Sequence, residues 1–256
     1  MFNETVLALM LTLGSPGKTL YSSVDVEKDA RPVVLKSGVY VELAEGEELP
    51  NPCKQRGNVA CRRPRFNKPR DAWVRTETYL EGLPRWWMIA QSIGANSHGD
   101  LDAAIRLIVT SRHESGWWRD VHAGYNHRPY TRKTKFEDGG LSWGLFQLLN
   151  SHDPEAPIGG TDLVMGDIVG VNSDATGKAT KVAAWHMSTV VKRCNKRGAG
   201  ATCWWLSYGG VTNPKDKRIM ARVSSWTKLK RTKPELRKLS AKVRNLLGLK
   251  KDKPKS

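Results

Sequence analysis

Residues 100–118 read DLDAAIRLIVTSRHESGWW, and this stretch predicts a helix that ends beside a single carboxylate. Asp100 is the expected N-cap, and apolar residues follow it at helical spacing. These apolar positions are Leu101, Ala104, Ile105 and Ile108. Glu114 then falls at or near the C-terminal end of the helix, in an aromatic and largely uncharged neighbourhood. Because desolvation by aromatic groups raises the pKa of a carboxyl, Glu114 is a candidate general acid, and glycosidic bond cleavage suits it best.

The remaining patterns predict a mainly α-helical domain with extensions at both ends. Residues 86–89 form an apolar cluster, and further helices are expected around residues 182–194 and 219–229. A polar, aromatic loop between Gly116 and Gly140 is expected to wall a cleft. Residues 33–35 and 39–41 predict a small β-hairpin. We therefore expect an N-terminal extension over residues 1–70 with a basic, proline-rich linker, a catalytic domain over 71–229, and a cationic tail over 230–256.

The formal net charge of +17 predicts attraction to polyanions such as nucleic acid, anionic lipid, lipopolysaccharide or acidic wall polymers. No nucleic-acid-binding motif accompanies the charge, so binding to nucleic acid would be non-specific. Leucine and valine recur at spacings of three and four after Pro234, which predicts a cationic amphipathic helix. That helix could bind a membrane or polyanion, or it could fold back on the domain as a solvated helix.

Four cysteines form two local pairs, Cys53 with Cys61 and Cys194 with Cys203, and local disulfides in an oxidising compartment are a plausible interpretation. Free thiols in a cytosolic protein are the alternative. Neither the cysteines nor the histidines have the spacing of a metal site, so we expect no metal and no cofactor.

The N-terminus carries an apolar run of signal-peptide length at residues 6–14. Glu4 precedes the run and no lysine or arginine does, which is unusual for an export signal. The run is also too short to span a bilayer, so we expect no stable transmembrane helix.

Three motifs follow one another in an order that resembles the catalytic domain of soluble lytic transglycosylases and their goose-type lysozyme relatives. They are Glu114-Ser115, then Gly144-Leu145-Phe146-Gln147, then Ser207-Tyr208-Gly209-Gly210 followed by Ala221-Arg222-Val223. The resemblance covers roughly residues 86–229. Gly209 departs from the pattern, because asparagine is usual at that position.

The resemblance implies a lysozyme-like helical fold that cleaves the β-1,4 bond between N-acetylmuramic acid and N-acetylglucosamine. Glu114 would protonate the leaving oxygen and then act as a base on the sugar's own 6-hydroxyl, which gives a 1,6-anhydro end. The substrate-contacting positions that it implies are Ser115, Ser142, Gly144, Leu145, Phe146, Gln147 and Tyr208.

A hydrolase would instead need a water molecule held by a second carboxylate. Asp138 lies six residues before Gly144, where goose-type lysozymes carry an aspartate, but Leu149 stands where they carry another. Asp120 and Asp153 are weaker candidates. The pattern therefore favours the non-hydrolytic product.

Tryptophans near the motifs could stack against sugar rings or could simply fill the core. These are Trp117, Trp118 and Trp143. The leading hypothesis is a monomeric, peptidoglycan-cleaving enzyme of the bacterial envelope or periplasm, of bacterial or phage origin. A degenerate particle protein that binds polyanions through its basic segments is the alternative.

Overall fold

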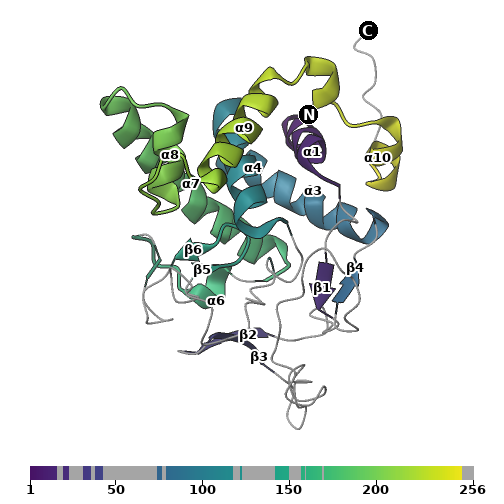
Figure 1. Ribbon diagram of the computed structural model, residues 1–256. Coiled ribbons are helices and arrows are strands. Elements are labelled where there is room, and N and C mark those ends of the chain that lie inside the picture. The colour runs from purple at the N-terminus through teal and green to yellow at the C-terminus, as the bar shows by residue number, and fades with distance from the viewer. Residues whose placement is uncertain are drawn as a thin grey trace. The chain divides into compact units, whose positions relative to one another are not determined.

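The computed structural model describes residues 1–15, 20–22, 31–35, 38–42, 74–76, 79–117, 122, 142–149, 157–158, 160–168 and 170–249. The described part of the chain is mainly helical, which confirms the predicted class (Figure 1). Its residues group into two compact units, one of Met1–Lys18, Thr78–Thr110 and His186–Ser256, the other of Thr19–Glu77 and Ser111–Trp185. The domain boundaries expected near residues 70 and 229 stay a prediction. Within the described ranges, no helix has the length and apolar character needed to cross a bilayer.

The first unit contains the N-terminal helix α1 (Phe2–Leu13), which packs against α3 (Tyr79–Asn96). The segment is rich in leucine, alanine and methionine, which favour a helix, and it ends at Gly14. Its residues from Val6 to Met10 are almost completely buried. Gly94 of α3 allows the close approach, because a Cβ there would overlap the side chain of Asn3. The apolar run that resembled a poor export signal is therefore part of the hydrophobic core of this unit.

The disulfide between Cys194 and Cys203 confirms one of the two expected local pairs. Four further helical segments make up the C-terminal part of the first unit, and the first of them contains Cys203. They are α8 (Ala201–Tyr208), α9 (Lys217–Arg231), the short 3-10 helix η1 (Pro234–Arg237) and α10 (Ala241–Leu246). Asp216 caps α9 by accepting a hydrogen bond from the Arg218 backbone at 2.7 Å. The cysteines at positions 53 and 61 lie outside the described residues.

The basic C-terminal segment differs from the single amphipathic helix that was predicted. It breaks between η1 and α10, where Ser240 starts a new helix by accepting a hydrogen bond from the Val243 backbone at 3.3 Å. Leu239 and Val243 are buried, and η1 packs against α1. Arg244 forms an ion pair with Glu4 of α1. The part of the tail up to residue 249 is thus folded back on its own unit.

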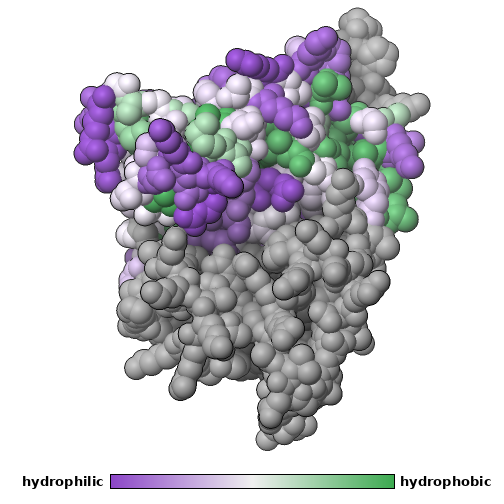
Figure 2. Space-filling view, in the orientation of Figure 1, coloured by the Kyte–Doolittle hydropathy of each residue, from purple (hydrophilic) through white to green (hydrophobic). Residues whose placement is uncertain are grey.

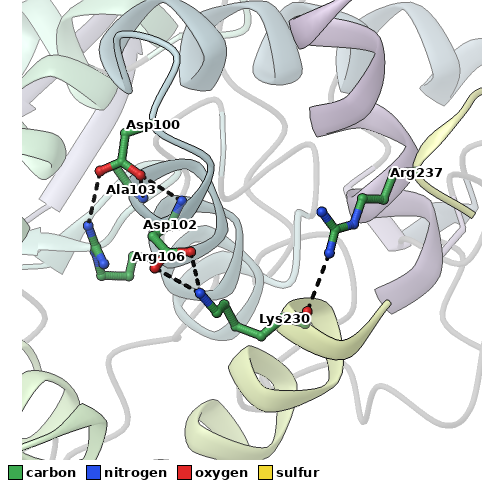
Figure 3. Close-up of polar contacts among 6 residues, drawn as sticks. All are labelled: Asp100, Asp102, Ala103, Arg106, Lys230 and Arg237. Carbon is green, nitrogen blue, oxygen red and sulfur yellow. Dashed lines mark hydrogen bonds and ion pairs between the residues drawn. The ribbon is translucent and has the colours of Figure 1, made fainter. Parts of the chain in front are cut away.

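An ion pair also joins the end of α9 to the start of α4 (Leu101–Ser115), as Figure 3 shows. Lys230 Nζ lies 2.6 and 2.8 Å from the two carboxylate oxygens of Asp102, and Arg237 donates to the Lys230 carbonyl at 3.3 Å. Asp100 caps α4 and also pairs with Arg106 at 3.8 Å. Several basic residues of the C-terminal region therefore have structural partners within this unit.

The second unit contains three two-stranded antiparallel sheets, the short helix α6 (Met165–Ile168), the end of α4 and residues 173–185 of α7 (Ser173–Lys196). The strand pairs are β1 (Leu20–Ser22) with β4 (Val74–Thr76), β2 (Arg31–Leu35) with β3 (Gly38–Glu42), and β5 (Ser142–Trp143) with β6 (Leu148–Leu149). The pairing of β2 with β3 confirms the predicted hairpin. Most of the predicted cleft loop lies outside the described residues, but His122 is buried and bonded to Thr176 of α7 at 2.8 Å.

Candidate active site

Glu114 lies in the last turn of α4, as the sequence predicted. The Asp100 carboxylate starts the helix by accepting hydrogen bonds from the backbone of Asp102 and Ala103 at 2.8 and 3.2 Å. Ala104, Ile105 and Ile108 are completely buried along one side of the helix. Glu114 itself is half-buried at this end of the helix.

The end of α4 is fixed by hydrogen bonds that centre on Ser115. Its hydroxyl donates to the Ser111 carbonyl at 2.8 Å and accepts from the Trp117 backbone at 3.1 Å. Gly116 and Trp117 both have positive φ angles, of 66° and 58°, so the helix cannot continue. Ser115 is 2 % exposed, and the two hydrogen bonds of its hydroxyl hold the backbone next to Glu114.

Trp117 is a core residue and does not offer a surface for a sugar ring. Its side chain is completely buried, and its indole N–H donates to the Ser111 hydroxyl at 2.9 Å. The Arg112 guanidinium lies 5.6 Å from the indole ring centre and donates to the Gly116 carbonyl at 3.3 Å. Burial lowers the pKa of Arg112 from its ordinary value. The side chains of the other two tryptophans considered for stacking, at positions 118 and 143, lie outside the description.

The second motif forms the tight turn that joins β5 to β6. Gly144 and Gln147 have φ angles of 68° and 47°, and both the backbone and the side-chain amide of Gln147 donate to the Gly144 carbonyl, at 3.2 and 3.0 Å. The side chains of Leu145 and Phe146 are completely buried. Neither residue therefore presents a surface to a ligand, contrary to the substrate contacts that the resemblance implies, whereas Gln147 is half-buried. Ser142 lies in β5, and its side chain is not described.

The third motif is in the first unit, where Tyr208 is the last residue of α8. Its ring meets the His186 ring edge to face, with centres 5.1 Å apart and an interplanar angle of 79°. Burial, with a smaller contribution from the charge of Arg193, lowers the pKa of His186. A Cβ at Gly209 would lie 2.8 Å from the Arg222 guanidinium, so no larger residue fits unless Arg222 moves. This crowding gives a physical reason for glycine at position 209.

Glu114, Ser115 and the turn of residues 144–147 thus belong to one compact unit, and Tyr208 belongs to the other. The possible second carboxylates at positions 138, 120 and 153 all lie outside the described residues. Sequence reasoning missed Ser111 and Arg112. A signal for Ser111 was its position four residues before Ser115, because a serine hydroxyl on a helix reaches the carbonyl of the preceding turn at that spacing. In the described ranges, no group of three His, Cys, Asp or Glu side chains could hold a metal ion.

Comparisons with known proteins identify no relative of this chain. No protein-family model matches it, and neither a curated protein nor a solved structure is similar to it.

Proposed function

We propose that this protein cleaves the β-1,4 bond between N-acetylmuramic acid and N-acetylglucosamine in peptidoglycan, with Glu114 as the catalytic acid and then the base. The observation that carries the proposal is the placement of Glu114, half-buried in the last turn of a helix whose end is fixed by Ser111, Ser115 and Trp117. A carboxyl that must give and then take a proton at one oxygen has to be held in place. The tight turn formed by residues 144–147 agrees with the second motif of lytic transglycosylases.

Glu114 would donate its proton to the glycosidic oxygen as positive charge develops at the anomeric carbon. The resulting carboxylate would accept the proton of the 6-hydroxyl on the same sugar, whose oxygen closes on the anomeric carbon. The product is a 1,6-anhydro end, and no water is consumed. Hydrolysis of the goose-type kind is the runner-up, and it would assign Asp138 to the water.

A location in the bacterial envelope belongs to the same proposal. The disulfide between Cys194 and Cys203 supports an oxidising compartment, because cytosolic reductants keep most thiols reduced. Delivery by a phage, as an endolysin or a virion-associated lysin, is one way for such an enzyme to reach the wall. We propose action as a monomer.

The test is mass spectrometry of fragments released from isolated peptidoglycan by the wild type and by Glu114→Gln. We expect anhydro-muropeptides from the wild type and a loss of at least about 100-fold in the variant, the usual contribution of a general acid. Glu235→Gln is the matched control, since it removes an exposed carboxylate from η1, and it should retain full activity. Melting curves of both variants check that they fold.

The outcomes separate the alternatives. Full activity in Glu114→Gln would refute the proposal. Fragments with reducing ends would show that the protein hydrolyses the bond and does not form 1,6-anhydro ends. If a folded wild type releases nothing, the alternative of a polyanion-binding particle protein is favoured.

A further inference from the structure

The end of α7 and its turn into α8 form a basic surface that the proposed chemistry does not use. We call residues 192–203 the basic clip. Its four cations, Lys192, Arg193, Lys196 and Arg197, are all exposed. Between Asp174 and Asp216 the sequence contains no acidic residue. Figure 2 shows hydrophilic side chains gathered over this end of α7, at the left of the view.

The basic clip is held rigid by several contacts. The Cys194–Cys203 disulfide closes it, with the two Cα atoms 5.9 Å apart. The backbone amide groups of Arg197 and Ala199 both donate to the Cys194 carbonyl at 3.0 Å. Trp204 donates from its indole to the Asn195 side chain at 3.3 Å. The cations therefore lie on a preorganised turn, so less conformational entropy is lost when a ligand binds.

Trp204 ties this turn to the rest of its unit. Its ring meets Trp226 of α9 edge to face with centres 5.6 Å apart, and the Arg106 guanidinium of α4 lies 5.4 Å from the ring centre. Trp204 is thus used for packing and is only 9 % exposed.

A purely structural role does not account for all four cations. Basic residues near a helix C-terminus interact favourably with the helix dipole, and one or two would suffice for that. Lys192 and Lys196 are like charges four residues apart on α7, which is unfavourable on a helix, and Arg197 adds a further like charge in the turn that follows. Other basic residues of the same unit have partners, as Lys230 has Asp102. By contrast, no ion pair joins the four cations of the basic clip to an acid within the described ranges.

We infer that the basic clip binds a phosphodiester polymer of the bacterial envelope. Guanidinium groups match phosphate geometry well, and two arginines and two lysines give a compact positive surface. No large apolar side chain is exposed within residues 192–203, so the clip has no platform for stacking bases and no group to insert into a bilayer. The disulfide points to an oxidising compartment, where nucleic acid is not the expected polyanion. The choice of the bacterial envelope rests on the proposed function, whereas the phosphate-binding surface does not.

The test is a titration of the full-length protein with fluorescently labelled poly(glycerol phosphate), read by anisotropy at several salt concentrations. One variant replaces Lys192, Arg193, Lys196 and Arg197 with Gln. The matched control replaces four exposed cations elsewhere in the unit with Gln, namely Arg231, Lys233, Lys238 and Lys242. Both variants lower the formal net charge of +17 by four, so they differ only in where the charge is lost.

We expect the clip variant to bind at least about 10-fold more weakly at 0.1 M salt, and the control to bind within about 2-fold of the wild type. Four phosphate contacts predict a slope of about −3 when the logarithm of the association constant is plotted against the logarithm of the salt concentration. In the clip variant this slope should be much closer to zero. The pair Cys194→Ser with Cys203→Ser keeps every cation, and we expect it to bind more weakly because the turn is no longer closed. Melting curves select folded variants.

Equal losses in the clip variant and the control would overturn the inference, because net charge alone would then explain binding. Equal affinity for polyglutamate of the same length would overturn the choice of phosphate. Tighter binding to DNA or to phosphatidylglycerol vesicles would overturn the choice of partner. Poly(glycerol phosphate) contains no bond that Glu114 would cleave, so Glu114→Gln should bind like the wild type and failure of either proposal can be recognised separately.

Discussion

The burial of α1 predicts that a single truncation, Leu9→Ala, will destabilise the protein strongly. Leu9 is completely buried in the contact of α1 with the rest of its unit. The change removes three carbon atoms, which is worth about 2.4 kcal/mol of transfer free energy at ~0.8 kcal/mol each. The cavity that remains adds to this, so we expect a loss of about 3 to 4 kcal/mol. For a chain of this size the melting temperature should fall by about 10 °C.

The assay is thermal and urea unfolding followed by far-UV circular dichroism at pH 7. Leu80→Ala is the matched control, because Leu80 is 63 % exposed on α3 and its truncation should change the stability by less than about 1 kcal/mol. If the two variants melt within about 2 °C of each other, α1 does not pack into the core as described. Such a result would mean that residues 6–14 lie outside the folded unit.

Three further outcomes are expected. Removing the disulfide by Cys194→Ser with Cys203→Ser should lower the free energy of unfolding by about 2.5 kcal/mol, as loop closure over a separation of 9 residues predicts. The measurement is urea unfolding of this variant and of the wild type with and without reductant, and equal midpoints for all three would contradict the prediction. Because the pKa of His186 is lowered from 6.5, the folded state binds fewer protons than the unfolded state, so wild-type stability should fall as the pH drops below about 6.5. His186→Phe keeps an aromatic ring and should weaken this dependence, whereas parallel curves of melting temperature against pH would contradict it. Ser111→Ala removes the acceptor of the buried Trp117 indole and should cost about 1–3 kcal/mol in urea unfolding, and an unchanged midpoint would show that this hydrogen bond is not needed.

Helices with strong local signals could be predicted from the sequence. The position of α4 follows from its Asp100 cap and its apolar spacing, and the core of α9 was expected over residues 219–229. The helix α7 begins at Ser173, well before the predicted 182, because Asn172 caps it through the Ala175 backbone at 2.8 Å. The following helix α8 was missed, since a helix this short depends on tertiary contacts.

The N-terminal apolar run shows a limit of composition. An export signal and a buried core helix have similar residues, and the difference lies in the partner surface. Here that surface includes α3, where Gly94 leaves room for Asn3. No local pattern in residues 1–14 could have indicated a partner about 80 residues further along the chain.

The candidate site was predictable in its main residue and not in its supports. Glu114 at a helix end follows from the spacing after Asp100. The role of Ser115 does not, because its two hydrogen bonds depend on the positive φ angles of Gly116 and Trp117. The same backbone geometry accompanies the burial of Trp117, which from sequence alone could equally have faced a ligand.

The way α4 ends also bears on the electrostatics of the proposed acid. A cation paired with Glu114 would hold the pKa of its carboxyl down, which is the opposite of what a general acid requires. Arg112 is a nearby cation in the sequence, but residues two apart do not face each other on a helix. Its guanidinium instead donates to the Gly116 carbonyl and lies over the Trp117 ring. Under the proposed function, the contacts that stop the helix therefore also give this cation partners of its own.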